Sequence, residues 1–124
     1  MELPFAWTTL RVRNMEQSLH FYHEILGLPI DRRMKPAPER EIVFLGSGPT
    51  KVELIAGPDT GPVTCEDSLS IGFIVPSVDE FIEALRARQI PVHAGPIQPN
   101  PHIRFFYVLD PDGLQVQFVE HIRE

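Results

Sequence analysis

The pattern of hydrophobic and polar positions along this chain occurs twice. In each copy an apolar stretch leads through a capping residue to apolar positions at helical spacing, which predicts a strand followed by an amphipathic helix. Ser77 and Glu80 form a capping box, and Asn14 with Gln17 is a looser version of it. The apolar positions of the two predicted helices are Met15, Leu19, Tyr22, Ile25 and Leu26 in the first, and Val78, Phe81, Ile82 and Leu85 in the second.

Both predicted helices have an end signal, and strands follow each of them. We expect the first helix to end at Gly27 and the second near Gln89. A short strand and a hairpin come next in both halves. The second hairpin turns at residues 110–113, where Pro is followed by Asp-Gly, and the first turns at 46–49, whereas 36–39 is expected to be a loop. Each half therefore reads strand, helix, strand, strand, strand, which predicts an α+β fold.

The chain has 124 residues, a length that suits one domain. We expect a single domain over 1–124, with repeat units at about 5–57 and 68–121. The segment 58–67, rich in Gly and Pro and poor in apolar residues, is expected to link them.

The repeat offset of 63 to 64 residues pairs equivalent positions in the two halves. Trp7 corresponds to Ser70, and Glu53 corresponds to Gln117. If a pseudo-twofold axis relates the halves, these four side chains face one shared concavity. Because side chains alternate along strands, further residues fall on the same faces. They are Phe5, Thr9, Arg11, Ile55, Gly72, Gln115 and Val119.

Charge and cysteine content restrict the class of partner. The net charge is −6 and the basic residues are scattered, with a small group at Arg32, Arg33 and Lys35, so a nucleic-acid partner is not expected. Cys65 is the one cysteine, which excludes an internal disulfide. We find neither a signal peptide nor an apolar run long enough to cross a membrane, and we expect a cytoplasmic protein. The acidic balance first of all favours solubility, and it also favours a cationic ligand.

Two motifs carry a resemblance to a known family. The first combines residues 10–12, 18–22 and 26–28, and the second combines the turn at 110–113 with residues 117–120. Together they resemble the vicinal oxygen chelate superfamily, which includes glyoxalase I, bleomycin and fosfomycin resistance proteins and extradiol dioxygenases. The resemblance covers Phe5 to His121. It implies two tandem βαβββ units whose curved mixed sheet surrounds a shared cavity, and it implies a homodimer.

The resemblance also implies where a metal would be held. The family's ligands lie on the first, fourth, fifth and eighth strands, which here places Trp7, Glu53, Ser70 and Gln117 at those positions. Zinc and related ions require imidazole and carboxylate ligands, and Glu53 is the one good ligand in this set. We therefore expect no metal cofactor. The alternative is a divalent Zn, Ni, Mn or Fe ion in an altered site. Arg11 lies where glyoxalase I carries an Arg for its glutathione substrate.

Several other residues are candidates for the site. Glu53, facing an apolar concavity, needs a partner, either a ligand cation or metal, or Arg11 or Gln117. His20 and His23 are expected on the solvent side of the first helix. His102 and Arg104 belong to a Pro-rich polar segment, residues 98–104, expected to be a loop at the cavity mouth. The aromatic residues are expected mostly in the core, with Tyr107 or Phe105 as a cavity wall.

Three functions follow from these patterns. The leading hypothesis is a small-molecule-binding protein whose cavity is lined by eight residues. They are Trp7, Thr9, Arg11, Glu53, Ser70, His102, Tyr107 and Gln117. The alternative is a metal-dependent lyase, isomerase or dioxygenase related to glyoxalase I, using Glu53 with residues such as His102. A third is a module without a ligand of its own. The sequence leaves open whether a site lies within one chain or between two.

Overall fold

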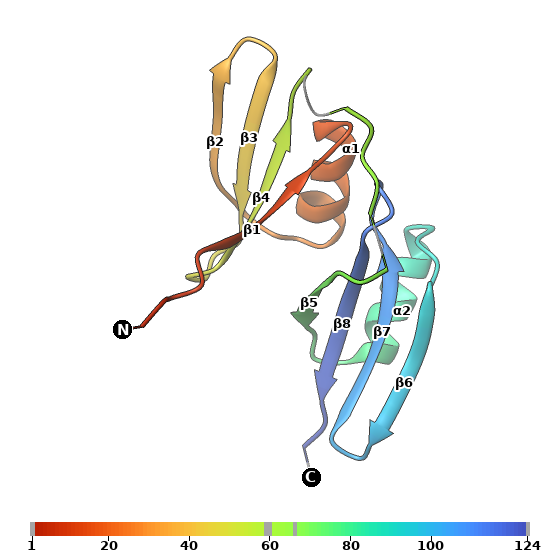
Figure 1. Ribbon diagram of the computed structural model, residues 1–124. Helices are drawn as coiled ribbons and strands as arrows, with labels where there is room; N and C mark the ends of the chain where they lie inside the picture. The colour runs from red at the N-terminus through yellow and green to blue at the C-terminus, as the bar shows by residue number, and fades with distance from the viewer. Residues whose placement is uncertain (1, 59–60, 66, 124) are drawn as a thin grey trace. The chain divides into compact units, whose positions relative to one another are not determined.

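Two compact units, Met1–Val63 and Thr64–Glu124, make up the chain in the computed structural model, which describes residues 2–58, 61–65 and 67–123 (Figure 1). The first contains β1 (Trp7–Arg11), α1 (Met15–Leu19), the π-helix η1 (His20–Ile25), β2 (Ile30–Ala37), β3 (Arg40–Leu45) and β4 (Lys51–Ala56). The second contains β5 (Ser70–Ile74), α2 (Val78–Ala87), β6 (Ala94–Asn100), β7 (Ile103–Leu109) and β8 (Gln115–His121). The predicted order of strand, helix and three strands is confirmed in both units.

The two sheets have the same topology. Their strand orders are β1-β4-β3-β2 and β5-β8-β7-β6. The first strand of each unit pairs in parallel with the last, and the remaining pairs are antiparallel. The predicted α+β fold of tandem βαβββ units is thus confirmed. The proposed single domain and the limits of the repeat units stay predictions, and residues 59–60 and 66 of the expected linker lie outside the described residues.

One face of the first sheet forms the core of its unit. Leu10, Leu54 and Val43 are register partners across three strands, and all three are buried. The helical segment adds Leu19 and Tyr22, both buried, to this core. Because strand side chains alternate, the residues between these positions must point to the opposite face.

The second unit has an aromatic core. Phe106 and Phe118 are register partners on neighbouring strands, and both are buried, with ring centroids 5.3 Å apart. Phe81 of α2 packs on them, 4.7 Å from the Phe118 ring. Helix α2 therefore covers this face of the sheet, and the other face is left to residues of intermediate or full exposure.

The capping residues act as the sequence predicts. The Asn14 side chain accepts a hydrogen bond from the Gln17 amide, and the Ser77 hydroxyl accepts one from the Glu80 amide. The predicted C-terminal ends of the two helices also agree with the structure. Gly27 has a φ of +79°, which ends the first helical segment, and α2 stops two residues before Gln89. None of the described helices is long and apolar enough to span a membrane.

The first helix is not a uniform α-helix, contrary to its periodicity. After Leu19 it continues as the π-helix η1, in which the Leu26 amide donates to the Phe21 carbonyl five residues earlier. The wider turn brings the consecutive aromatics Phe21 and Tyr22 both into the core, where they pack at 4.8 Å. An α-helical pattern alone would have left Phe21 outside.

Two segments expected to be loops are strands. β2 continues through Ala37, so the predicted loop at 36–39 is reduced to a two-residue turn. β6 runs to Asn100 through two prolines, so 98–104 is an edge strand, a turn and the start of β7 rather than a loop. Proline is tolerated there because an edge strand need not donate every amide to a neighbour. Arg104, named with His102 in that expected loop, is ion-paired with Asp79 at 2.8 Å.

An ion-pair cluster ties the first helix to its sheet. Arg33 on β2 donates to the carboxylate of Glu41 on β3, and its other arm reaches Glu16 of α1 at 3.2 Å. The hydrogen bond to Glu41 and the nearby negative charges raise the pKa of Arg33 above its ordinary value. Arg33 therefore stays charged and helps to fix the helix over this face.

Phe105 and Phe106 point to opposite faces of the second sheet, and substitution of each residue tests this assignment. Phe106 is fully buried, whereas Phe105 lies on the uncovered face beside Tyr107. We expect Phe106→Ala to lower the free energy of unfolding by ~3–5 kcal/mol, and the matched Phe105→Ala to cost clearly less. Urea unfolding followed by circular dichroism measures both, and equal losses would show that the faces are assigned incorrectly.

Candidate functional site

The uncovered face of the first sheet gathers a row of chemically distinct side chains. Thr9, Glu53, Phe44 and Arg32 are register partners in order across β1, β4, β3 and β2. The same alternation that buries Leu10 on the helix side places these four on the other side. One hydroxyl, one carboxylate, one aromatic ring and one guanidinium thus lie side by side.

Glu53 is the buried polar residue of this row, with 9% of its surface exposed. Its Oε1 accepts a hydrogen bond from the Thr9 hydroxyl at 2.5 Å. Within its own unit the partner is Thr9 and not Arg11, one of the intramolecular partners expected from the sequence. A neutral donor satisfies one oxygen and leaves the negative charge uncompensated by a cation.

Trp7 and Phe44 form an aromatic corner next to this carboxylate. Their rings meet edge to face, with centroids 5.1 Å apart and planes at 75°. Phe44 is buried, but Trp7 keeps 48% of its surface exposed. An indole that is anchored on one side and open on the other offers a face on which a planar ligand can stack.

Arginine and lysine side chains border the same face. Arg11 lies one row from Thr9 along β1 and is exposed, with Ile55 as its register partner. Lys51, the register partner of Trp7, donates to the Gly46 carbonyl and lies 3.8 Å from Asp31. The guanidinium of Arg32 stands over the Phe44 ring, 5.6 Å from its centroid.

The uncovered face of the second sheet combines an amide with aromatic rings. Gly72, Gln117 and Tyr107 are register partners on neighbouring strands. A Cβ at Gly72 would meet the Gln117 Oε1 at 3.3 Å, so the missing side chain leaves room for the amide. Phe105 and Tyr107 meet edge to face at 6.0 Å, so both lie on this face, and the role of either as a cavity wall stays a prediction.

The other two candidates of this unit lie at its margins. Ser70 begins β5, is exposed and pairs in register with Gln115, one row from Gln117. His102 lies in the two-residue turn between β6 and β7, where it is exposed and its amide donates to the Asn100 side chain at 2.8 Å. At ~3.3 Å per residue, His102 is about 17 Å along the strand from Tyr107, so the structure does not bring these two together.

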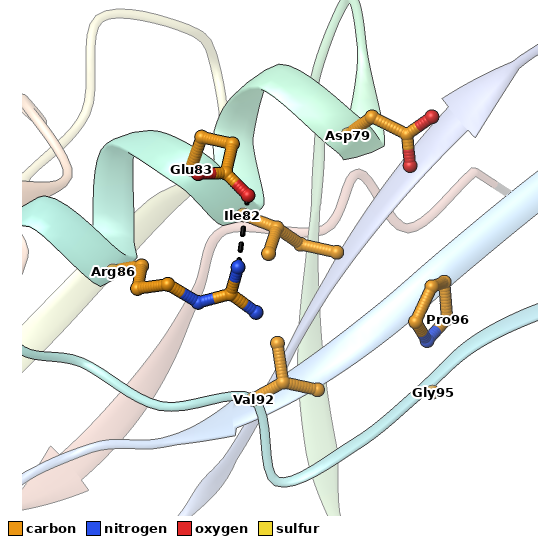
Figure 2. Close-up of a pocket in the computed structure, with 7 residues that line it drawn as sticks. All are labelled: Asp79, Ile82, Glu83, Arg86, Val92, Gly95 and Pro96. Carbon is orange, nitrogen blue, oxygen red and sulfur yellow. Dashed lines mark hydrogen bonds and ion pairs between the residues drawn. The ribbon is translucent and has the colours of Figure 1, made fainter.

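A hollow in the second unit lies on the helix-covered side of its sheet, opposite the face that carries Gln117 and Tyr107. Figure 2 shows this hollow between α2 and the segment leading into β6, with a volume of about 360 Å³. Its lining residues are Asp79, Ile82, Glu83, Arg86, Val92, Gly95 and Pro96. Its charged rim is internally paired, because Arg86 binds Glu83 at 2.9 Å and Asp79 binds Arg104. None of the predicted site residues lines it.

The residues at the family's metal positions do not fit a tightly bound ion. An indole has no lone pair to donate, and Ser70 and Gln117 offer neutral oxygens. Glu53 is a suitable ligand, but one of its oxygens is engaged by Thr9. Within the described ranges, no three His, Cys, Asp or Glu side chains gather as a metal site. His20 is exposed, as expected, and pairs with Glu24 at 2.9 Å, whereas His23 is half-buried and its ring bonds to the Leu28 carbonyl.

Comparison with known proteins identifies the family. Residues 5–118 match the model of the Glyoxalase/Bleomycin resistance protein/Dioxygenase superfamily. The chain belongs to this superfamily. A lactoylglutathione lyase from Haemophilus influenzae is 30% identical over 122 residues, covering 92% of this chain and 90% of its own length.

Solved structures with the same fold include an enzyme and an antibiotic binding protein. The chain is similar to the trypanothione-dependent glyoxalase I of Leishmania major, with a TM-score of 0.80, 25% identity, and coverage of 96% and 87% of the two chains. It shares its fold with TnmS3, an antibiotic binding protein from a Streptomyces species, with a TM-score of 0.77, 21% identity and 98% coverage of both chains. The fold is therefore shared by proteins named as enzymes and by a protein named as a binder.

Sequence reasoning missed two residues of the first face. Phe44 was assigned to the core, and it is buried, but its ring belongs to the uncovered side with Trp7. Arg32 stands out in the sequence only as a member of the basic group Arg32, Arg33 and Lys35. The register of β2 shifts between Ile30 and Arg32, so simple counting along the strand does not give its face. The only signal was its position in the hairpin opposite Phe44.

The hydrogen bond between Thr9 and Glu53 is expected to stabilise the protein. Thr9→Val leaves a buried carboxylate without its donor, and we expect a loss of ~1–3 kcal/mol in the free energy of unfolding at pH 7. The double variant Thr9→Val/Glu53→Leu is expected to recover most of this loss. Thr8→Val, on the other face of β1, is the matched control for urea unfolding. Equal effects of the two threonine substitutions would contradict the assigned bond.

Proposed function

We propose that this protein binds a small, partly aromatic molecule without the metal chemistry of its enzyme relatives. The observation that carries the proposal is Trp7, which packs edge-on against Phe44 while keeping an open face, and which the family resemblance assigns to a metal-ligand position. Tryptophan cannot coordinate a metal ion, but its indole ring offers a large surface on which a ligand can pack.

The chemistry of both uncovered faces supports binding of this kind. Aromatic side chains contribute much of the contact energy in small-molecule sites, and a few polar groups fix the orientation of the ligand. The first unit supplies Trp7 and Phe44 with Glu53, and the second supplies Tyr107 with Gln117. Pairing of two copies, implied by the family resemblance, is part of the proposal, and light scattering of the purified protein tests it.

Ligand binding to chelator-treated protein is the first test. Trp7 is the sole tryptophan, so its emission reports directly on the proposed site. We expect at least one member of a panel of naphthalene, quinoline and phenazine derivatives to change this emission saturably, with the same affinity in EDTA. Trp7→Ala should weaken binding by about tenfold in calorimetry, equivalent to ~1.4 kcal/mol.

The control for that experiment removes an exposed apolar side chain elsewhere. Ile30 is 38% exposed and pairs with Leu45, on the helix-covered side of the same sheet. Ile30→Ala should leave the affinity unchanged. A panel that leaves both the emission and the heat of mixing unchanged would remove the basis of the proposal.

A metal-dependent lyase is the second candidate, and two specific observations favour it. Glu53 keeps a carboxylate, buried, at the family position on the fourth strand. The relatives matched over about nine-tenths of the chain are named lactoylglutathione lyase. In this case the metal would be held by Glu53 with ligands outside the family's usual set, and loss of Glu53 would abolish both metal binding and activity.

Metal loading separates the two candidates. The protein is incubated with zinc, nickel, manganese and ferrous iron, desalted and submitted to elemental analysis. We expect clearly less than one ion per chain, and we expect His20→Ala to reduce any retained metal, because His20 and Glu24 form an exposed pair of ligand-type groups. Near-stoichiometric metal that is lost in Glu53→Gln and kept in His20→Ala would make the lyase the leading function.

A further inference from the structure

Arg32 differs from its neighbouring cations in what holds its side chain. Arg33 is bound by the carboxylates of Glu41 and Glu16, and Lys51 lies near Asp31. The Arg32 guanidinium instead lies over the ring of Phe44. Across the described part of the chain, no carboxylate lies within ion-pair distance of Arg32. Its hydrogen-bonding capacity is thus available to a ligand.

The support under Arg32 is rigid. Phe44 is buried, and Trp7 packs edge-on against its ring. A guanidinium over an aromatic ring keeps its N–H donors at the edge of its plane, where a carboxylate can accept two of them at once. An arginine arranged in this way loses less side-chain freedom on binding than one in open solvent.

The charge of this face is opposite to the charge of the whole chain. Arg11 and Arg32 are both exposed here, and Glu53 is the acid of the row, largely buried and bound to Thr9. The chain as a whole carries −6. An incoming charged group meets the local guanidiniums at short range, whereas distant surface acids are screened by salt. The cationic ligand favoured by the overall charge is therefore disfavoured at this face.

We propose that the ligand is an aromatic carboxylate whose ring stacks on Trp7 and whose carboxylate is recognised by Arg32 above Phe44. This inference rests on the proposed binding function and adds the charge class of the ligand. Arg32 is accordingly the residue that determines specificity. Its planar donor pair suits a carboxylate, and its charge rejects an ammonium group at the same place.

Three matched probes test the inference by isothermal titration calorimetry: 2-naphthoate, 2-naphthylmethanol and 2-naphthylmethylammonium. We expect wild-type protein to bind the carboxylate at least tenfold more tightly than the ammonium compound, with the alcohol between them. Arg32→Gln should weaken binding of the carboxylate by about ten- to a hundredfold and leave the alcohol unchanged. Arg32→Lys should recover only part of the loss, because a point charge replaces a planar fork.

The matched control removes one positive charge elsewhere on the same strand. Lys35 is exposed and has no register partner on β3, because it lies in the irregularity of β2 between Met34 and Ala37. Lys35→Gln should bind all three probes as the wild type does, with an unchanged melting temperature.

Each other outcome overturns the inference in a recognisable way. Tighter binding of the ammonium or alcohol probe shows that the face does not select an anion, while the binding function stands. Equal weakening by Arg32→Gln and Lys35→Gln shows that only the overall charge matters. If all three probes fail to bind at millimolar concentration, the aromatic carboxylate is excluded, and the wider panel read by Trp7 emission decides whether the binding function fails with it.

Discussion

In each unit the described helical segment packs on one face of a four-stranded sheet, and the character of the other face follows from that arrangement. Alternation along the strands sends Leu10, Leu54 and Val43 toward the helix and Thr9, Glu53 and Phe44 away from it. The helix-covered face secures most of the buried apolar contacts. The uncovered face is therefore free to carry groups such as a buried carboxylate or a half-exposed indole, which would be costly in a closed core.

The two units use the same framework with different chemistry. Thr9 and Glu53 are register partners in the first unit, and Gly72 and Gln117 occupy the equivalent pair in the second. The first pair places a charge against a hydroxyl donor, whereas the second makes space for a neutral amide. An internal repeat thus preserves topology while each copy keeps its own polar groups. This separation shows how one fold can carry sites of different chemistry.

Local charge, not total charge, decides what the first face can attract. The acids that give the chain its negative balance include Glu16 and Glu41, which pair with Arg33 on the helix side. Arg32 on the uncovered side is held by an aromatic ring instead. Neighbouring residues of one strand thus have opposite roles, since Arg33 fixes the helix and Arg32 faces outward. The net charge counts Arg32 and Arg33 equally, so it does not distinguish an arginine paired with carboxylates from one that lies over an aromatic ring.

The sequence alone determined the order of elements, the caps at Asn14 and Ser77, the amphipathic character of the second helix and the family, because these depend on local spacing and on short motifs. Alternation within the strands also put Thr9 on one face with Glu53 and Gly72 on one face with Gln117, and these residues are register partners, whereas the shared concavity stays a prediction. The tertiary structure decided the π-turn at Phe21, the strand state of the Pro-rich edge β6 and the partner of Glu53. It alone brought Arg32 over Phe44, because a register shift in β2 sets which residue faces which. Register depends on pairing between distant segments, and no local pattern encodes it.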